Sequence, residues 1–454
     1  MTDIKNIKRI YFLGIGGIGM SALARYFNAK GVVVSGYDKA ETPLTKQLVK
    51  EGIGVHYEDN IEFIDKEADL VVYTPAVPKD HKELNHFLAN KYSVVKRSDV
   101  LGAITNSSFN ICIAGTHGKT TTSTMVAHIL RHSEYGCNAF LGGIAVNYDT
   151  NFWSSDKNVC VVEADEYDRS FLKLSPDVAI ISSMDPDHLD IYGTAENMEQ
   201  AFIDFAGKIK PGGLLISKFG LKRNADLKAD NHLTYHLQDK NADAYAAGIK
   251  MNNGSYRFDV LIKEKKIRDV VLNMGGRHNI ENVIAAITVA HHLGIEEDKI
   301  KKAVEDFRGV KRRFEYIVKE EGQVFIDDYA HHPEELRALI SGAKALFAGK
   351  KCTVVFQPHL YSRTRDHADG FAEVLSLADE VFLLPIYPAR ELPMEGVNSE
   401  MILSKMKGSD KKVLEKNGLL EWIKNNKTEL LITAGAGDID TLVEPIKNII
   451  IKKQ

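Results

Sequence analysis

The stretch that decides the fold runs Asn110-Ile-Cys-Ile-Ala-Gly115-Thr-His-Gly118-Lys119-Thr-Thr-Thr-Ser-Thr124. Its apolar run, Ile111 to Ala114, predicts a buried strand, and apolar residues at helical spacing after the lysine predict a helix. Gly115 and Gly118 turn the chain between them. Unpaired backbone N–H groups and the helix dipole favour an anion at such a helix start, so the stretch predicts a phosphate-binding loop.

The residues of this loop indicate nucleotide chemistry. Lys119 can reach the β- and γ-phosphates of a nucleotide, and the Thr120 hydroxyl can hold Mg²⁺. The usual pattern has a glycine five residues before Gly118, where this chain has Ile113, so the loop is a shortened variant. The alternative is an ordinary turn with a surface lysine. The run of Thr and Ser after Lys119 favours the phosphate-binding interpretation.

A second glycine turn lies near the N-terminus. Gly14-Ile-Gly16-Gly17-Ile-Gly19 separates a predicted strand at 10–13 from a predicted helix, and the next strand ends near Asp38. This pattern is typical of a diphosphate-binding turn, with Asp38 either a ribose partner or a strand-end cap. A further strand, 69–74, ends in a turn at 75–78, at the sheet edge where open α/β sheets bind ligands.

Acidic residues follow an apolar strand in the middle of the chain. The run 159–162 leads into Glu163-Ala-Asp165-Glu166, which is the pattern of a metal-holding strand beside a phosphate loop. The alternative is a strand end with solvated acids. Another apolar strand, 178–182, is followed by Asp187-His188. A lone histidine is more often structural, but its place beside other polar strand ends makes it a candidate ligand.

The region after residue 244 changes character. Residues 244–274 alternate apolar and polar residues around an Asn-Asn-Gly turn and predict small antiparallel hairpins. His278, Asn279 and Asn282 precede a predicted helix from Val283, where they could face a nucleotide base. The alternative is that Asn279 only caps that helix.

The α/β alternation resumes after Gly309 and continues toward the C-terminus. Polar clusters at 327–332 and 357–365 follow two of its predicted strands. We therefore predict an α/β protein of three domains, at 1–106, 107–310 and 311–454. The first and third are Rossmann-like, and the central one is a P-loop ATPase-type α/β domain with a small antiparallel β section.

Composition limits the classes of partner. A formal net charge of −4 gives no positive field for nucleic acid or membrane, and no run approaches a membrane span. The basic and apolar N-terminus imitates a signal peptide, but its four glycines fit a nucleotide turn better. Four scattered cysteines without a CxxC pair indicate reduced core residues. We expect a cytoplasmic protein, a monomer or weak homodimer, with no nucleic-acid or membrane partner.

The chain resembles the Mur ligases of peptidoglycan synthesis over nearly its whole length. The motifs that carry the resemblance are Gly-Ile-Gly-Gly-Ile-Gly-Met at 14–20, Gly-Thr-His-Gly-Lys-Thr-Thr at 115–121, Glu-Ala-Asp-Glu at 163–166, Asp187-His188, Gly-Arg-His-Asn at 276–279, Gly-Val-Lys-Arg-Arg-Phe at 309–314, Asp-Asp-Tyr-Ala-His-His-Pro at 327–333 and Gln-Pro-His at 357–359. Within the family it is most similar to the enzymes that join L-alanine to UDP-N-acetylmuramate. The nearest alternative is a murein-peptide recycling ligase acting on the same nucleotide sugar.

The resemblance implies a role for each matching position. The ATP-binding residues would be Gly115, Thr116, His117, Gly118, Lys119, Thr120, Thr121, His278, Asn279, Asn282 and Asp328. The metal ligands, for Mg²⁺ or Mn²⁺, would be Thr120, Glu163 and His188. The UDP-sugar residues would be Gly14, Gly16, Gly17, Gly19, Asp38, Thr74 and Ala76. The amino-acid site would contain Tyr329, His331 and Arg363. The catalytic residues would be Lys119, Glu163, His188, Arg312, Arg313 and His331.

The resemblance also implies a mechanism. ATP would convert the carboxylate of the sugar to an acyl phosphate, with Lys119, metal and Arg312 or Arg313 neutralising charge on the transferred group. The amine of alanine would then attack, and His331 or a nearby carboxylate would take its proton. An NAD-dependent oxidoreductase would explain residues 14–38 alone and leave the phosphate loop unexplained. A non-catalytic scaffold would not need the set of Lys119, Thr120, Glu163 and His188.

Overall fold

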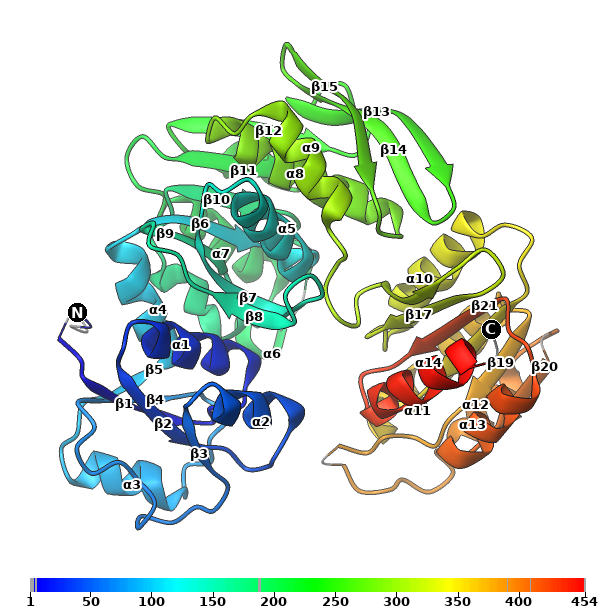
Figure 1. Ribbon diagram of the computed structural model, residues 1–454, viewed down its shortest axis with the longest axis horizontal. Helices are drawn as coiled ribbons and strands as arrows, with labels where there is room; N and C mark the ends of the chain where they lie inside the picture. The colour runs from blue at the N-terminus through cyan, green and yellow to red at the C-terminus, as the bar shows by residue number, and fades with distance from the viewer. Residues whose placement is uncertain (1–3, 5, 187–188, 390, 409, 453–454) are drawn as a thin grey trace. The chain divides into compact units, whose positions relative to one another are not determined.

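The structure is a computed structural model that describes Ile4 and residues 6–186, 189–389, 391–408 and 410–452. Its named strands form three sheets in chain order (Figure 1). Within the described ranges, no helix combines the length and the apolar character that a membrane crossing needs.

The chain divides into two compact units. The first comprises Met1–Ala247, Asp259–Arg268 and Glu281–Val304, and the second comprises Gly248–Phe258, Asp269–Ile280 and Glu305–Gln454. The predicted boundaries at residues 106 and 310 are a finer division than this one and remain predictions.

The N-terminal sheet is parallel, with strand order β3-β2-β1-β4-β5. Its strands are β1 Arg9–Leu13, β2 Val33–Tyr37, β3 Gly54–His56, β4 Leu70–Tyr73 and β5 Val94–Lys96. Its helices are α1 Ile18–Ala29, α2 Pro43–Lys50, α3 Lys82–Ala89 and α4 Arg97–Asn106. The strand order reverses beside β1, and ligands of open α/β sheets bind at such a point, outside the carboxyl ends of the strands.

The middle sheet has ten strands in the order β15-β14-β13-β12-β11-β10-β6-β9-β7-β8. They are β6 Phe109–Ala114, β7 Asn138–Ala145, β8 Thr150–Trp153, β9 Val159–Glu163, β10 Val178–Ile181, β11 Leu214–Lys218, β12 Asn231–His236, β13 Ala244–Asn252, β14 Ser255–Ile262 and β15 Lys265–Leu272. The accompanying helices are α5 Lys119–His132, α6 Leu189–Tyr192, α7 Ala195–Ala206, α8 Arg277–His292 and α9 Glu297–Asp306, with 3₁₀ segments η1 Tyr167–Lys173 and η2 Asn224–Asp226. Two-residue turns join β13 to β14 and β14 to β15, and connections this short allow only antiparallel pairing.

The N-terminal and middle sheets share one hydrophobic core, which includes Phe12, Phe27, Phe140 and Phe202. Helix α1 packs against β7 and β8 at this junction. Arg25 of α1, only 6% exposed, donates from Nη1 to the Asn151 side chain of β8. Asn151 in turn donates from Nδ2 to the Ile18 carbonyl oxygen at 2.5 Å. A buried polar network therefore holds the helix that follows the glycine turn against the middle sheet.

The C-terminal sheet has the order β16-β17-β21-β18-β19-β20, and only the β16–β17 pair is antiparallel among its described pairs. Its strands are β16 Glu315–Lys319, β17 Val324–Asp328, β18 Cys352–Phe356, β19 Glu380–Leu383, β20 Asp410–Val413 and β21 Leu430–Ala434. Its helices are α10 Pro333–Leu346, α11 Tyr361–Leu375, α12 Ser399–Lys405, α13 Lys416–Asn425 and α14 Val443–Lys452, with the 3₁₀ segment η3 Asp438–Leu442.

Two predicted helices begin earlier than the apolar pattern indicated. Helix α8 begins at Arg277 rather than at the predicted Val283, and α11 begins at Tyr361, whereas the apolar pattern predicts a helix only from Phe371. In both cases the first turns carry polar side chains, so apolar periodicity detects only the later turns. The alternative in which Asn279 caps a helix at Val283 is therefore wrong, because Asn279 lies inside α8.

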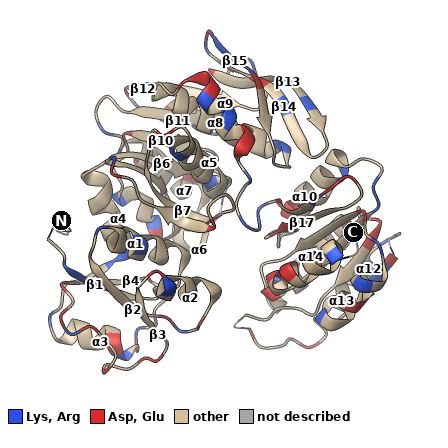
Figure 2. Cartoon of the chain, viewed as in Figure 1, with Lys and Arg blue, Asp and Glu red and all other residues tan. Residues whose placement is uncertain are grey.

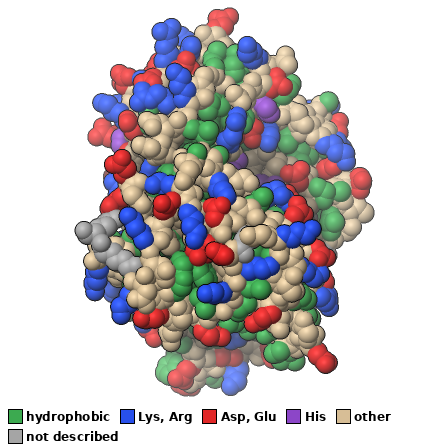
Figure 3. Space-filling view, turned by 90° about the vertical axis from the view of Figure 1, so that its right-hand side faces the viewer, with side chains coloured by type: hydrophobic (Ala, Val, Ile, Leu, Met, Phe, Trp, Pro, Cys, Tyr) green, Lys and Arg blue, Asp and Glu red, His purple; other side chains and the backbone are tan. Residues whose placement is uncertain are grey.

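The distribution of charges and the burial of the cysteines are as the composition predicts. Lys, Arg, Asp and Glu recur along the chain (Figure 2), and both signs mix on the face drawn in Figure 3, as a net charge of −4 leads one to expect. The four cysteines are free and buried. Burial raises the pKa of the Cys137 and Cys352 thiols to about 12, so these two thiols stay protonated and unreactive.

Candidate functional site

The first unit contains a cavity of about 1010 Å³ at the carboxyl ends of β1, β2 and β4. All seven residues predicted to bind the UDP-sugar line it: Gly14, Gly16, Gly17, Gly19, Asp38, Thr74 and Ala76. Glu163, the last residue of β9, and Asp165, two residues after it, line the cavity as well. One cavity therefore joins the glycine turn to the acidic end of β9.

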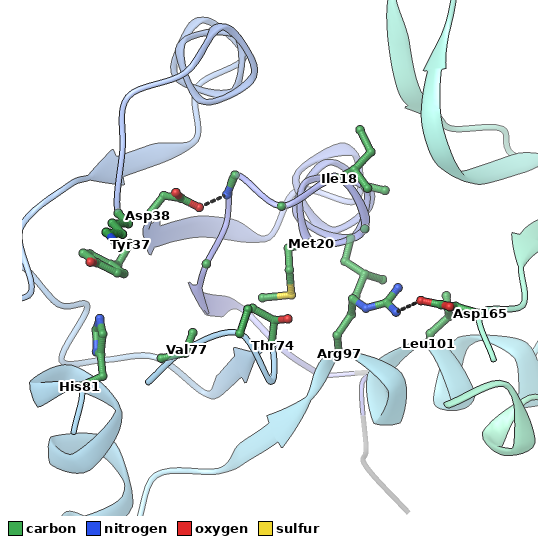
Figure 4. A pocket seen from close by; sticks show the side chains of 18 of the residues that line it. Ile18, Met20, Tyr37, Asp38, Thr74, Val77, His81, Arg97, Leu101 and Asp165 are labelled. Atoms are coloured by element: carbon green, nitrogen blue, oxygen red, sulfur yellow. Dashed lines mark hydrogen bonds and ion pairs between the residues drawn. The ribbon is translucent and has the colours of Figure 1, made fainter. Parts of the chain in front are cut away.

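Most backbone amides of the glycine turn donate hydrogen bonds to acceptors within the protein. The amides of Gly14 and Ile15 donate to Tyr37 O at 2.8 and 3.0 Å, and that of Gly17 donates to Gly14 O. The Gly16 amide donates to Asp38 Oδ2 at 2.7 Å (Figure 4). Asp38 thus holds the turn in place, which matches the strand-end alternative, and its predicted role toward the UDP-sugar remains a prediction.

The phosphate loop takes the shape that the motif predicts. Gly118 lies at φ +81° directly before α5, a conformation that favours glycine. Ser183 Oγ bonds the Thr116 hydroxyl and accepts from the His117 amide, both at 2.8 Å, while Ser182 Oγ donates to His117 O. Ser182 and Ser183, which follow β10, therefore fix the loop from the neighbouring strand. No sequence pattern indicates their role beyond their place at a strand end.

Lys119 is held between two acceptors. Its Nζ donates to Gly115 O and to Glu166 Oε1, both at 2.7 Å. Glu166 is 1% exposed, and its other carboxylate oxygen has no hydrogen-bond partner among the described residues. Burial raises the pKa of Glu166, against the opposing effect of Lys119. An ammonium has three N–H donors, so one remains for a phosphate.

The predicted metal ligands Thr120 and Glu163 lie together. Thr120 Oγ1 donates to Glu163 Oε1 at 3.0 Å, and the Gly142 amide donates to Glu163 Oε2 at 3.0 Å. A Cβ on Gly142 would lie 2.2 Å from that oxygen, so only glycine allows this approach. Burial raises the pKa of Glu163, while Lys119 and Thr120 lower it. The third predicted ligand, His188, lies outside the described residues.

The remaining predicted nucleotide residues lie in α5, α8 and β17. Asn282 approaches the phosphate loop, because a Cβ on Gly118 would lie 2.8 Å from Asn282 Oδ1. Asn279 donates from Nδ2 to Gly275 O at 2.7 Å, and His278 lies one residue before it on α8. Thr121 is buried in the first turn of α5, and its predicted phosphate contact remains a prediction.

Asp328, the predicted ribose partner, is occupied within the second unit. Its Oδ2 accepts from the Phe314 amide at 2.6 Å and its Oδ1 from the Ala330 amide at 2.7 Å. Burial raises the pKa of Asp328 to about 6, although both hydrogen bonds oppose this. In this state of the protein the side chain fastens the turn that carries Arg312 and Arg313.

The two candidate arginines differ in their surroundings. Arg312 donates from Nη2 to Gly435 O and lies 3.5 Å from Asp327 and 3.6 Å from Asp440. Arg313 is exposed, and its guanidinium lies 5.7 Å from the centre of the Tyr329 ring. Arg312 is thus tied to the ends of β17 and β21, whereas Arg313 can reach a ligand at a smaller cost in broken contacts.

The predicted amino-acid residues gather in the second unit. The rings of Tyr329 and His331 are 5.2 Å apart, those of His331 and His359 are 6.3 Å apart, and Arg363 Nη1 lies 3.1 Å from His359 Nδ1. His331 Nδ1 lies 2.9 Å from Tyr329 O. A carbonyl oxygen only accepts, so Nδ1 carries the proton and a neutral His331 presents a basic Nε2. His359 was not among the predicted residues.

Three family models match consecutive parts of the chain. The "Mur ligase family, catalytic domain" matches residues 9–109, the "Mur ligase middle domain" matches 113–290, and the "Mur ligase, glutamate ligase domain" matches 312–438.

Curated relatives match over nearly their whole length. A UDP-N-acetylmuramate–L-alanine ligase of Porphyromonas gingivalis is 49% identical over 449 residues, covering 97% of this chain and 98% of the relative. An enzyme of the same name from Flavobacterium johnsoniae is 46% identical over 452 residues, covering 99% of both.

Solved structures give the same result. The UDP-N-acetylmuramate–alanine ligase of Thermotoga maritima is 30% identical with a TM-score of 0.84, covering 99% of this chain and 100% of that one. A murein peptide ligase of Psychrobacter arcticus is 23% identical with a TM-score of 0.67, covering 97% and 99%, which shows a shared fold. The family models, the relatives and the fold agree, and the chain belongs to the Mur ligase family.

Proposed function

We propose that this protein is an ATP-dependent ligase that joins L-alanine to UDP-N-acetylmuramate through an acyl phosphate. The products are UDP-N-acetylmuramoyl-L-alanine, ADP and phosphate. The names of the Porphyromonas and Flavobacterium relatives, at 49% and 46% identity, support this choice of substrates.

The observation that carries the proposal is the continuity of the cavity in the first unit. It contains all seven residues predicted for the UDP-sugar and extends to Glu163, whose carboxylate bonds the Thr120 hydroxyl next to Lys119. A sugar nucleotide in this cavity would therefore have its diphosphate at one end and the predicted ATP and metal residues at the other.

The oxygen atoms around Glu163 fit Mg²⁺ or Mn²⁺. A carboxylate and a hydroxyl are hard ligands, and Mg²⁺ in proteins keeps several waters and takes its other oxygens from substrate phosphates. Within the described ranges, no three His, Cys, Asp or Glu side chains form a metal cage, so this site would depend on nucleotide and water. Thr120 and Glu163 would hold the ion, which when bound neutralises phosphate charge.

Cationic residues would bind the phosphates, and a second group of residues would bind alanine and accept its proton. Lys119 would place its third N–H on a phosphate oxygen, and the exposed Arg313 would approach the transferred group, so that charge developing in the transition state meets fixed cations. Tyr329 and Arg363 would bind alanine. His331, with its Nδ1 proton on Tyr329 O, would accept a proton from the amine at Nε2.

The test is phosphate release from ATP by the purified protein, measured with UDP-N-acetylmuramate and L-alanine together and with each omitted. We expect release only when both are present. Release with the free tripeptide L-alanyl-γ-D-glutamyl-meso-diaminopimelate, but not with alanine, would identify a recycling ligase instead. An absence of release with either acceptor amine would refute the proposal.

A further inference from the structure

Arg97 lines the cavity of the first unit, and none of the roles described so far involves it. It is the first residue of α4, and its guanidinium lies against Gly19 at the start of α1. A Cβ on Gly19 would lie 2.7 Å from Arg97 Nη1, so the absence of a side chain there makes room for the guanidinium. On its other side Arg97 forms an ion pair with Asp165 at 3.7 Å (Figure 4).

Arg97 differs from the other cations that line the cavity. Among the described residues these are Lys39 and Lys82, and both are exposed. The Arg97 side chain is 24% exposed, so an anion beside it would be less screened by water. A guanidinium also presents a planar fork of donors that matches phosphate oxygens in pairs, which a lysine ammonium does not.

The hydrogen bonds of the glycine turn leave the first-turn amides of α1, beside Arg97, as the donors for an anion. The amides from Gly14 to Gly17 are taken by acceptors of the protein itself. The first bond of α1 runs from the Ser21 amide to Gly17 O, so the amides of residues 18–20 precede the intrahelical bonds. A phosphate bound by these first-turn amides would lie beside Gly19, within reach of the guanidinium.

We propose that Arg97 binds the diphosphate of the UDP-sugar and exchanges Asp165 for it. The assignment rests on the proposed function, because it takes the ligand to be a uridine diphosphate sugar. The Arg97–Asp165 pair is partly exposed and 3.7 Å apart, so it contributes little and is readily displaced. A bidentate guanidinium–phosphate contact is shorter and stronger, so the exchange favours the ligand.

The test is calorimetric binding of UDP, UDP-N-acetylglucosamine and UDP-N-acetylmuramate, without ATP, to the wild type, R97A and R97K. Loss of a charge-assisted hydrogen bond predicts about 10- to 100-fold weaker binding of all three ligands to R97A. R97K should be intermediate, because lysine keeps the charge and loses the fork. A loss confined to UDP-N-acetylmuramate would mean that Arg97 binds the carboxylate of the sugar, and it would overturn the proposal. Unchanged binding of UDP to R97A would overturn it as well.

The neighbouring residue supplies a matched control. Lys96 pairs with Asp168 at 3.8 Å, and its side chain is 43% exposed against 24% for Arg97. It is absent from the cavity lining. K96A removes one positive charge one residue away from Arg97, so it should leave UDP binding within about twofold of the wild type. An equal loss of UDP affinity in K96A and R97A would mean that only the overall positive charge of the domain matters. It would contradict a direct contact between Arg97 and the diphosphate.

Asp165 gives a test of opposite sign. D165N removes the resting partner of Arg97 but keeps the oxygen that accepts from the Tyr167 amide. If the pair only holds α4 in place, D165N should weaken UDP binding as R97A does, which would overturn the proposal. If Asp165 competes with the diphosphate, D165N should bind UDP as tightly as the wild type or more tightly.

The outcome is separable from that of the proposed function. Binding of UDP and its loss in R97A are measured without turnover. If the wild type binds the three nucleotides through Arg97 but releases no phosphate with alanine, the assignment of Arg97 stands and the proposed reaction fails.

Discussion

Lys119 illustrates how a motif residue depends on a partner that the motif does not name. The phosphate-loop pattern identifies the lysine, and the structure shows its ammonium between Gly115 O and the buried Glu166. Glu166 lies at the end of the acidic run after β9, but the sequence pattern could not separate it from Glu163 and Asp165. Only the fold shows which carboxylate reaches the lysine and which lines the cavity.

Replacing Lys119 by alanine should abolish turnover and leave UDP-sugar binding nearly intact. One phosphate-binding cation at a phosphoryl-transfer site is worth about 3 kcal/mol or more of transition-state stabilisation, or at least roughly 10²-fold in rate. Lys119 does not line the cavity that contains the glycine turn. Phosphate release and calorimetry with UDP-N-acetylmuramate measure the two effects, and a loss of sugar binding in K119A would contradict the separation of the two sites.

Glu83 is a buried acid whose charge makes stability depend on pH. It accepts from the Tyr11 hydroxyl at 2.7 Å, and burial raises its pKa from 4.5 to about 7. A carboxyl with a raised pKa in the folded state keeps a proton that the unfolded chain releases. Its contribution to stability is therefore present below about pH 4.5 and is lost as the pH rises to about 7.

Replacing Glu83 by glutamine removes this loss, because the amide does not ionise. Between pH 5 and pH 8 the free energy of unfolding of E83Q should gain about 2 kcal/mol relative to the wild type. Urea denaturation of both proteins at the two pH values measures this difference. E62Q, at a side chain 71% exposed, is the control and should show no such change. A constant difference between E83Q and the wild type would mean that Glu83 is already ionised at pH 5.

At the scale of elements, the sequence predicts strands better than helix starts. The predicted strands at 10–13, 111–114 and 159–162 are short apolar runs, and the structure places β1, β6 and β9 there. Helices α8 and α11 begin earlier than their apolar residues indicate, because their first turns are polar. Strands β16 and β20 and helices α12, α13 and α14 were missed, since their patterns are short or mixed.

For the candidate site too, the sequence predicts some features and not others. Placement of the glycine turn, Thr120 and Glu163 follows from strand ends in a parallel sheet, and the sequence predicts it. Contacts such as the Gly142 amide on Glu163 join elements that are distant in the sequence, and no local pattern indicates them.

The close approach of Gly142 in β7 to Glu163 at the end of β9 leads to a prediction. In G142A the new Cβ would lie 2.2 Å from Glu163 Oε2 and displace the carboxylate from its place beside Thr120. Partners that orient a metal ligand are typically worth about 10- to 100-fold in metal affinity or activity, so G142A should need about 10-fold more Mg²⁺ or lose as much in rate. Metal titration of phosphate release measures it. G322A, where a Cβ meets nothing within 4 Å, should behave as the wild type, and an equally normal G142A would exclude Glu163 from metal binding.

At the scale of the whole molecule, the candidate residues are distributed over two compact units. Every residue that lines the cavity belongs to the first unit, and Arg313, Tyr329, His331 and Arg363 belong to the second. Binding of the UDP-sugar should therefore affect the first unit, and binding of alanine should affect the second.

Hydrogen exchange followed by mass spectrometry can resolve this. UDP-N-acetylmuramate alone should slow exchange in peptides covering residues 14–20 and 74–78 and leave those covering 312–332 and 357–365 unchanged, because the cavity lies within the first unit. Addition of ATP analogue and alanine is the comparison in which the second group of peptides should respond. Slower exchange in the second unit with the sugar nucleotide alone would show that its binding involves that unit.

The buried contact between Arg25 and Asn151 limits how this chain can be recombined with others. A chimera that exchanged residues 4–106 for the same segment of another ligase would leave Asn151 facing a foreign helix. If that helix lacked an arginine at the matching position, the Asn151 side-chain oxygen would stay buried without its donor, at a cost of about 1–3 kcal/mol. The smallest piece suited to transplantation therefore ends well beyond the first sheet and includes β8. A library of hybrid ligases should be cut outside residues 4–247, or the pair should be carried across together.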